Sequence, residues 1–127
     1  KTITQLLRRA AATHDLMMIF VGLETPALHI QRVQERVAAG GHNIPEDKIR
    51  ERWVSSRLNL VRLLPHLSRL QVLDNSAQVA HGAPLPDPLL LLEMKGGKVT
   101  YPSRANPVVL AATPDWARPI VQAAFTL

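Results

Sequence analysis

The sequence contains no cysteine, which excludes disulfide bonds, thiolate chemistry and cysteine-based zinc sites. It also has no apolar run near the roughly 20 residues that are needed to span a bilayer. The longest such run, residues 16–23 (LMMIFVGL), has the length of a strand, and the first residues, KTITQLLRR, do not resemble a signal peptide. We therefore expect a cytoplasmic protein without a membrane segment.

Several catalytic motifs are absent as well. The chain has no His-Glu-x-x-His and no Gly-x-Ser-x-Gly, and its five histidines show no close metal-ligand spacing. The phosphate-cradling pattern Gly-x-x-x-x-Gly-Lys-[Ser/Thr] is also missing, and KGGK at residues 95–98 lacks its frame. A zinc hydrolase has no support, and the chain should not catalyse phosphoryl transfer alone.

Apart from these absences, the composition is typical of one folded domain. The chain has 127 residues, of which 46% are hydrophobic and 20% are charged, so we expect a buried core. The net charge is +5, and the basic excess is concentrated between Arg32 and Arg69. This balance favours an anionic partner, which could be nucleic acid, a nucleotide or a membrane surface.

The pattern of apolar residues predicts an α/β fold. Residues 2–13 read as a helix, and residues 16–23 as a parallel strand with both faces buried. Thr25 and Pro26 predict the start of a second helix, which Gly40 or Gly41 should end. A long helix is expected from Pro45, followed over residues 69–76 by a short strand and a turn.

The later part of the chain reads differently. Residues 77–88 are rich in alanine, glycine and proline and are expected to be a linker. Gly96-Gly97, between two strand-like runs, predicts a hairpin, and residues 113–127 predict a helix that Pro119 interrupts. We therefore divide the chain into residues 1–76, the linker 77–88, and a hairpin and helix extension over 89–127.

Two basic helix stripes flank the Gly-Gly loop. His29, Arg32 and Arg36 share one face of the helix before the loop. The helix after it carries a polar stripe, whose members are Lys48, Arg52, Ser55 and Asn59. If the helices fold back on each other, Arg36 and Arg52 would converge, and guanidinium pairs suit phosphate oxygens. The alternative is two solvated basic faces, with pairs such as Glu46 and Arg50.

Three other residues have a structural explanation beside the functional one. His42 is interpreted as a loop histidine, and Trp53, at core spacing, as a core residue. Asn75, in the sequence Asp-Asn-Ser after a strand, could contact a nucleotide or could form a plain turn.

Residues 16–76 resemble the C-terminal half of the zeta-toxin-like P-loop kinases. The resemblance rests on a strand followed by Leu-x-[Ser/Thr]-Pro, on Arg-Val-x-x-Gly-Gly-His-x-Ile-Pro, and on Lys-Ile-x-x-Arg with a later Asp-Asn-Ser. It implies a three-layer α/β/α P-loop kinase fold, incomplete here, with ATP or GTP and Mg²⁺ as cofactors. It also implies UDP-N-acetylglucosamine as the phosphate acceptor and a neutralising antitoxin as a partner.

The same resemblance implies lid cations that contact the nucleotide phosphates. Arg36 and Arg52 match best, Lys48 and Arg50 are neighbours, and Asn75 is a weaker match. The family's phosphate loop and general base lie N-terminal to the matched region. Since the chain begins at Lys1, we expect an excerpt of a kinase that is inactive alone; a split half and a remnant are the alternatives.

Two other function classes stay open. A helix-turn-helix-like nucleic-acid-binding module would suit the two basic helices and their short connection, although the strand at residues 16–23 does not fit it. A non-catalytic scaffold, in which the basic face serves solvation only, is the third.

Overall fold

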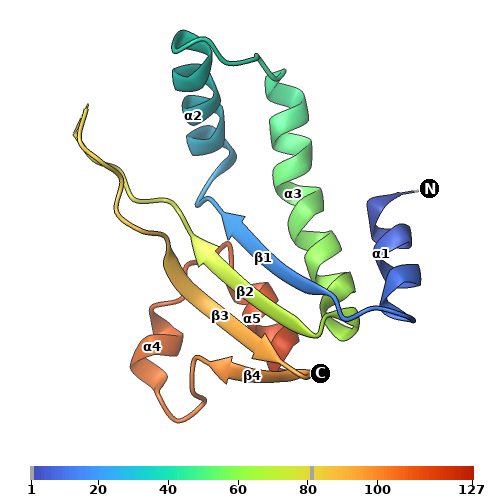
Figure 1. The fold of residues 1–127 in the computed structure, drawn as a ribbon. Coiled ribbons are helices and arrows are strands. Elements are labelled where there is room, and N and C mark those ends of the chain that lie inside the picture. Colours follow the sequence, from blue (N-terminus) through green and yellow to red (C-terminus); the bar gives the residue numbers. More distant parts are fainter. Residues whose placement is uncertain (1, 81) are drawn as a thin grey trace.

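The structure is a computed structural model that describes residues 2–80 and 82–127. It is a mixed α/β fold with one open, four-stranded sheet (Figure 1). Its elements, in chain order, are α1 (Ile3–Ala11), β1 (Met17–Gly22), α2 (Pro26–Ala38), α3 (Glu46–Leu63), η1 (Leu64–His66), β2 (Arg69–Asp74), β3 (Leu89–Lys95), β4 (Lys98–Tyr101), α4 (Pro107–Ala111) and α5 (Arg118–Phe125).

The sheet has the strand order β1-β2-β3-β4. β1 and β2 are parallel, as the sequence predicted, and the connection between them consists of α2, α3 and η1. β2–β3 and β3–β4 are antiparallel. The hairpin turn is confirmed, since Gly96 and Gly97 have φ values of 58° and 77°, as a type I′ turn requires.

The ends of α2 follow the predicted capping chemistry. The Thr25 hydroxyl accepts a hydrogen bond of 3.1 Å from the Leu28 amide, and Pro26 begins the helix. At the other end Gly40 has φ +100°, and the Gly41 amide donates to the Arg36 carbonyl at 2.7 Å. The Gly-Gly pair thus closes the helix against the backbone of Arg36.

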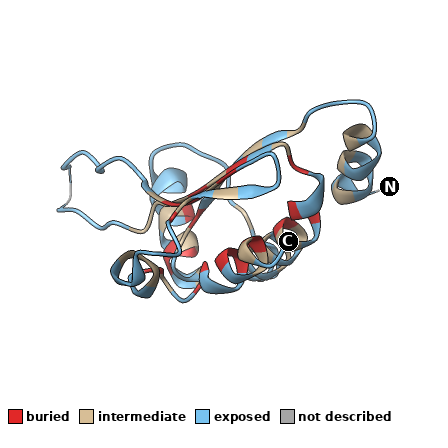
Figure 2. Ribbon diagram, turned by 90° about the horizontal axis from the view of Figure 1, so that it is seen from below, coloured by how far each residue is buried: buried red, intermediate tan, exposed pale blue. Residues whose placement is uncertain are grey.

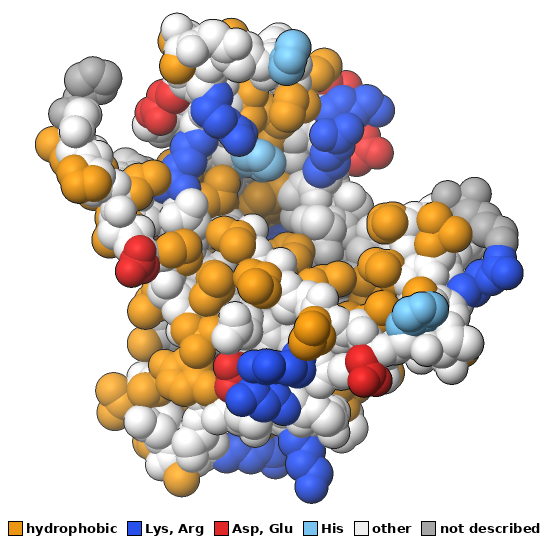
Figure 3. Space-filling model, viewed as in Figure 1, with side chains coloured by type: hydrophobic (Ala, Val, Ile, Leu, Met, Phe, Trp, Pro, Cys, Tyr) orange, Lys and Arg blue, Asp and Glu red, His pale blue; other side chains and the backbone are white. Residues whose placement is uncertain are grey.

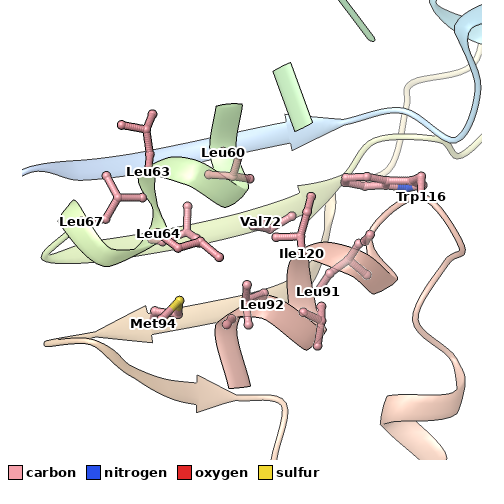
Figure 4. Close-up of a cluster of buried hydrophobic side chains, with 14 residues drawn as sticks. Leu60, Leu63, Leu64, Leu67, Val72, Leu91, Leu92, Met94, Trp116 and Ile120 are labelled. Carbon is pink, nitrogen blue, oxygen red and sulfur yellow. The ribbon is translucent and has the colours of Figure 1, made fainter. Parts of the chain in front are cut away.

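One main core lies beneath the sheet, where α3, η1 and α5 meet β2 and β3 (Figure 4). Residues 89–127, expected as an extension, share both this sheet and this core with residues 1–76. The fully buried members with large side chains are Leu60, Leu64, Leu70, Val72, Leu92 and Ile120. A smaller cluster, Ile30, Val33 and Ile49, joins α2 to α3.

The prediction that both faces of the first strand are buried was wrong. β1 is an edge strand, and the side chains of Met17, Ile19 and Val21 are 73%, 66% and 51% exposed. Figure 2 shows α3 and α5 on one side of the sheet. Over the described residues no helix covers the other side, so two layers are present where three were expected.

The C-terminal helix also differs from the prediction. Within residues 113–127 the structure has one helix, α5, which begins only at Arg118; α4 lies before residue 113. Pro119 lies in the first turn of α5, where its missing amide costs no hydrogen bond, so it helps to start this helix. Among the described residues, no helix is both long and apolar enough to cross a membrane.

Candidate anion-binding cleft

A cleft of about 870 Å³ opens at the carboxyl ends of the parallel strands β1 and β2. Its floor contains the end of β1, and its walls are α2, α3 and the segment that follows β2. In open α/β sheets, ligands commonly bind in the crevice outside the carboxyl ends of the parallel strands. Figure 3 shows Lys and Arg side chains gathered on both sides of a hollow between α2 and α3.

The sequence predicted that Arg36 and Arg52 share one site, and both line this cleft. The packing of the two helices explains why. Arg36 follows the buried Val33 by one turn of α2, and Arg52 follows the buried Ile49 by one turn of α3. Because Val33 and Ile49 belong to the same small cluster, the two arginines are carried to one side of the helix pair.

The charge of the cleft is strongly unbalanced. Four arginines and one histidine line it, together with a single carboxylate among the described lining residues; these are Arg32, Arg36, Arg52, Arg57, His29 and Glu35. None of the four arginines forms a salt bridge with a described residue. Such an excess of cations over one hollow favours an anionic ligand.

Burial and the nearby positive charge change the pKa of His29. Its pKa is lowered, first because the imidazole is partly buried and second because the Arg36 guanidinium repels its protonated form. His29 is therefore a neutral group of the cleft near pH 7, and a ligand anion that offsets Arg36 would raise its pKa.

Arg32 has a different task from Arg36 and Arg52. Its guanidinium donates to the backbone carbonyls of Asn75 and Ala77, the latter at 2.9 Å. The segment 77–85, of which the structure describes 77–80 and 82–85, lines the cleft opposite the helices. Arg32 therefore fastens the beginning of this segment, which the sequence had suggested only as a linker.

The remaining predicted residues are distributed as follows. Asn75 lines the cleft. Its backbone N–H donates to the Gly22 carbonyl at 3.0 Å, and this hydrogen bond joins the ends of β1 and β2. Lys48 and Arg50 are exposed and do not line the cleft, and Lys48 lies 3.7 Å from Glu51 in a surface ion pair. His42 is exposed in the loop and lies outside the cleft.

The face that α3 turns to the cleft is rotated from the predicted stripe. Arg52 belongs to both, but the cleft is then lined by Trp53, Ser56 and Arg57. Trp53 is only partly buried, and its indole N–H donates to the Leu23 carbonyl at 3.0 Å. As the sequence predicted, the Trp53 side chain packs against the main core, and its indole N–H also fixes α3 to the end of β1.

A second tryptophan completes the floor. Trp116 is 4% exposed and lies against Gly22, where a β-carbon would come within 2.2 Å of Cη2 of the indole. Phe20 and Trp116 pack with their ring centres 6.3 Å apart. Glycine at residue 22 is therefore required by the approach of Trp116, a contact from far along the chain that no local pattern could predict.

The chain matches no protein-family model, and comparisons with curated proteins and with solved structures found no significant match. The geometry and charge of the cleft are therefore what a functional proposal has to explain.

Proposed function

We propose that this chain is the nucleotide-binding lid half of a kinase of the zeta-toxin type, in which Arg36 and Arg52 bind the phosphate groups of ATP or GTP. The observation that carries the proposal is the charge of the cleft at the ends of the two parallel strands. Four arginines line it, but only one carboxylate does so among the described residues. Guanidinium groups bind phosphate oxygens through paired hydrogen bonds, and their charge offsets the charge of a triphosphate.

The proposed part in the reaction is to hold and shield the nucleotide. Arginines on two separate helices can contact different oxygens of a phosphate chain, and cations placed in this way stabilise charge on the transferred group. The sequence has no phosphate-cradling loop, so transfer to an acceptor such as a UDP-N-acetylglucosamine would require the N-terminal half that the resemblance implies.

The described residues do not group as ligands for a metal ion. Over the described part of the chain, no three histidine or acidic side chains are grouped as metal ligands. In this proposal Mg²⁺ arrives with the nucleotide, and the N-terminal half would supply the protein ligands. We therefore assign the metal no role in this cleft.

The proposal is tested by thermal stabilisation. A ligand that binds only the folded chain raises its melting temperature by mass action. ATP with Mg²⁺ should raise the melting temperature of the wild-type chain, and Arg36→Ala should reduce that shift. Lys48→Ala, which removes an exposed cation from outside the cleft, is the matched control and should retain the full shift.

Duplex DNA is the competing ligand in the same assay. A nucleic-acid-binding module would show the larger stabilisation with DNA, and this stabilisation would fall steeply with added salt. If DNA stabilises the chain and ATP does not, the nucleotide-binding proposal is wrong and the helix-turn-helix-like alternative is favoured.

A further inference from the structure

Arg57 is the most firmly held cation of the cleft. Its guanidinium carbon lies 3.4 Å from the centre of the Trp53 ring, a cation–π stack. Its Nε donates to the Trp53 carbonyl at 3.0 Å, and its Nη1 donates to the Trp116 carbonyl at 3.3 Å. The stack and the two hydrogen bonds fix the plane of the guanidinium relative to α3 and to the loop before α5.

Among the described residues, this fixed cation has no counter-ion. Both of its hydrogen-bond acceptors are neutral carbonyl groups, and no described carboxylate lies within salt-bridge distance of it. Partial burial lowers the pKa of the Arg57 guanidinium, because the charged form has lost part of its hydration. Proteins usually pair a partly buried charge, since leaving it alone is costly. An anionic ligand would supply the missing charge.

Arg57 also has hydrogen-bond donors that no described residue uses. Its Nη2 group has no hydrogen-bond partner among the described residues, although the side chain lines the cleft. A guanidinium that is already held in one geometry loses little further conformational freedom when a ligand binds. Arg36 and Arg52, by contrast, are exposed and make no side-chain hydrogen bond within the described chain, so binding must order them.

We propose that Arg57 is a third, preorganised phosphate-binding residue of the cleft, which receives one phosphate group while Arg36 and Arg52 close on the rest. This inference rests on the proposed function, because it assigns a further ligand-binding residue to the same site. It goes beyond the resemblance, which pointed to Arg36, Arg52 and their neighbours. It also gives Trp53 a role, as the surface on which the binding guanidinium is stacked.

Tryptophan fluorescence offers a direct readout of phosphate binding at Arg57. Its two tryptophans, Trp53 and Trp116, both line the cleft, and both contact Arg57. Intrinsic fluorescence should therefore change when inorganic tripolyphosphate, a probe without a base or sugar, binds to the wild-type chain. The affinity is measured in parallel by calorimetry, so that a loss of signal can be separated from a loss of binding.

Two substitutions and one control test the assignment. Arg57→Gln removes the charge and should weaken tripolyphosphate binding by about tenfold or more, as expected for a lost hydrogen bond to a charged group. Arg57→Lys keeps a positive charge and should recover part of the affinity. Arg62→Gln makes the same change on the exposed side of α3, outside the cleft, and should leave the affinity within about twofold of wild type.

The outcomes separate this inference from the proposed function. All titrations are made well below the melting temperature of each variant, so that destabilisation alone cannot imitate weak binding. If the wild-type chain binds tripolyphosphate and Arg57→Gln binds it equally well, Arg57 is only a structural residue and the inference is wrong. Wild-type affinity in Arg57→Lys would overturn the preorganised role, since lysine keeps the charge but not the stacked, planar guanidinium. If the wild-type chain binds neither tripolyphosphate nor ATP, both proposals fail.

Discussion

The indole of Trp116 fills the space beside Gly22, so that a β-carbon at residue 22 would lie 2.2 Å from the ring atom Cη2. This contact joins the end of β1 to the loop before α5, and both lie at the floor of the cleft. The two residues are far apart in the sequence, but together they set how closely the C-terminal part of the chain can approach the parallel strand pair.

Gly22→Ala should therefore destabilise the fold. Overpacking of a tight contact usually costs about 1–3 kcal/mol, which lowers the melting temperature of a domain of this size by several degrees. Thermal unfolding followed by circular dichroism measures the change. The double variant Gly22→Ala/Trp116→Leu is the control: its cost should be smaller than the sum of the two single costs, because leucine leaves room for the methyl group. If the stability cost of the double variant equals the sum of the two single costs, the two side chains are not in tight contact.

Arg32→Gln should loosen the segment after β2 while leaving the sheet intact. The glutamine cannot reach both the Asn75 and Ala77 carbonyls, so amide hydrogen exchange should become faster over residues 77–80. Exchange within β2 and β3 should stay slow, because their ladder does not involve Arg32. Arg50→Gln is the matched control on an exposed surface. Unchanged exchange in the 77–80 segment would show that Arg32 does not hold it.

His29 should titrate below its ordinary pKa of 6.5 in the free protein. Because the unfolded chain then binds the proton more tightly, the contribution of His29 to the free energy of unfolding falls as the pH drops below 6.5, and it levels off below the folded-state pKa. The imidazole proton shifts in an NMR titration measure this pKa directly. Added tripolyphosphate should raise it, since the anion offsets the charge of Arg36. A midpoint at or above 6.5 in the free protein would contradict the described environment.

Ile19→Thr should cost little stability, because the side chain is 66% exposed on the open face of the sheet. We expect a change within about 0.5 kcal/mol and, if the apolar face causes self-association, a smaller fraction of oligomer in sedimentation experiments. Val72→Thr is the matched control in the neighbouring strand, where residue 72 is 0% exposed and an unpaired hydroxyl would cost roughly 1–3 kcal/mol. Similar losses from both substitutions would show that the face around Ile19 is covered.

The sequence predicted those features that depend on neighbouring residues. Thr25 and Pro26 start α2, Gly40 ends it, and Gly96-Gly97 form the hairpin turn, because capping and left-handed backbone are local properties. Arg36 and Arg52 were singled out from their spacing on the two helices, and both line the cleft.

Features that depend on distant contacts were not predictable in this way. The apolar run of β1 indicated burial on both faces, but whether a strand face is covered depends on the elements around it, and β1 lies at an edge. Trp53 packs against the core, as its spacing predicted, but its stack with Arg57 was not predicted, and Arg57 and Trp116 were not singled out. Their roles arise from a stack and from backbone carbonyls that only the folded chain brings together.

The most direct test of the account is calorimetric titration of tripolyphosphate into the wild-type chain, into Arg36→Ala and Arg52→Ala, and into the double variant. Each single substitution is expected to weaken binding by about tenfold, and the double variant should lose measurable binding, because both guanidinium groups contact one ligand. Binding of wild-type affinity in the double variant would contradict this expectation, since the two arginines would then share a cleft without sharing a ligand.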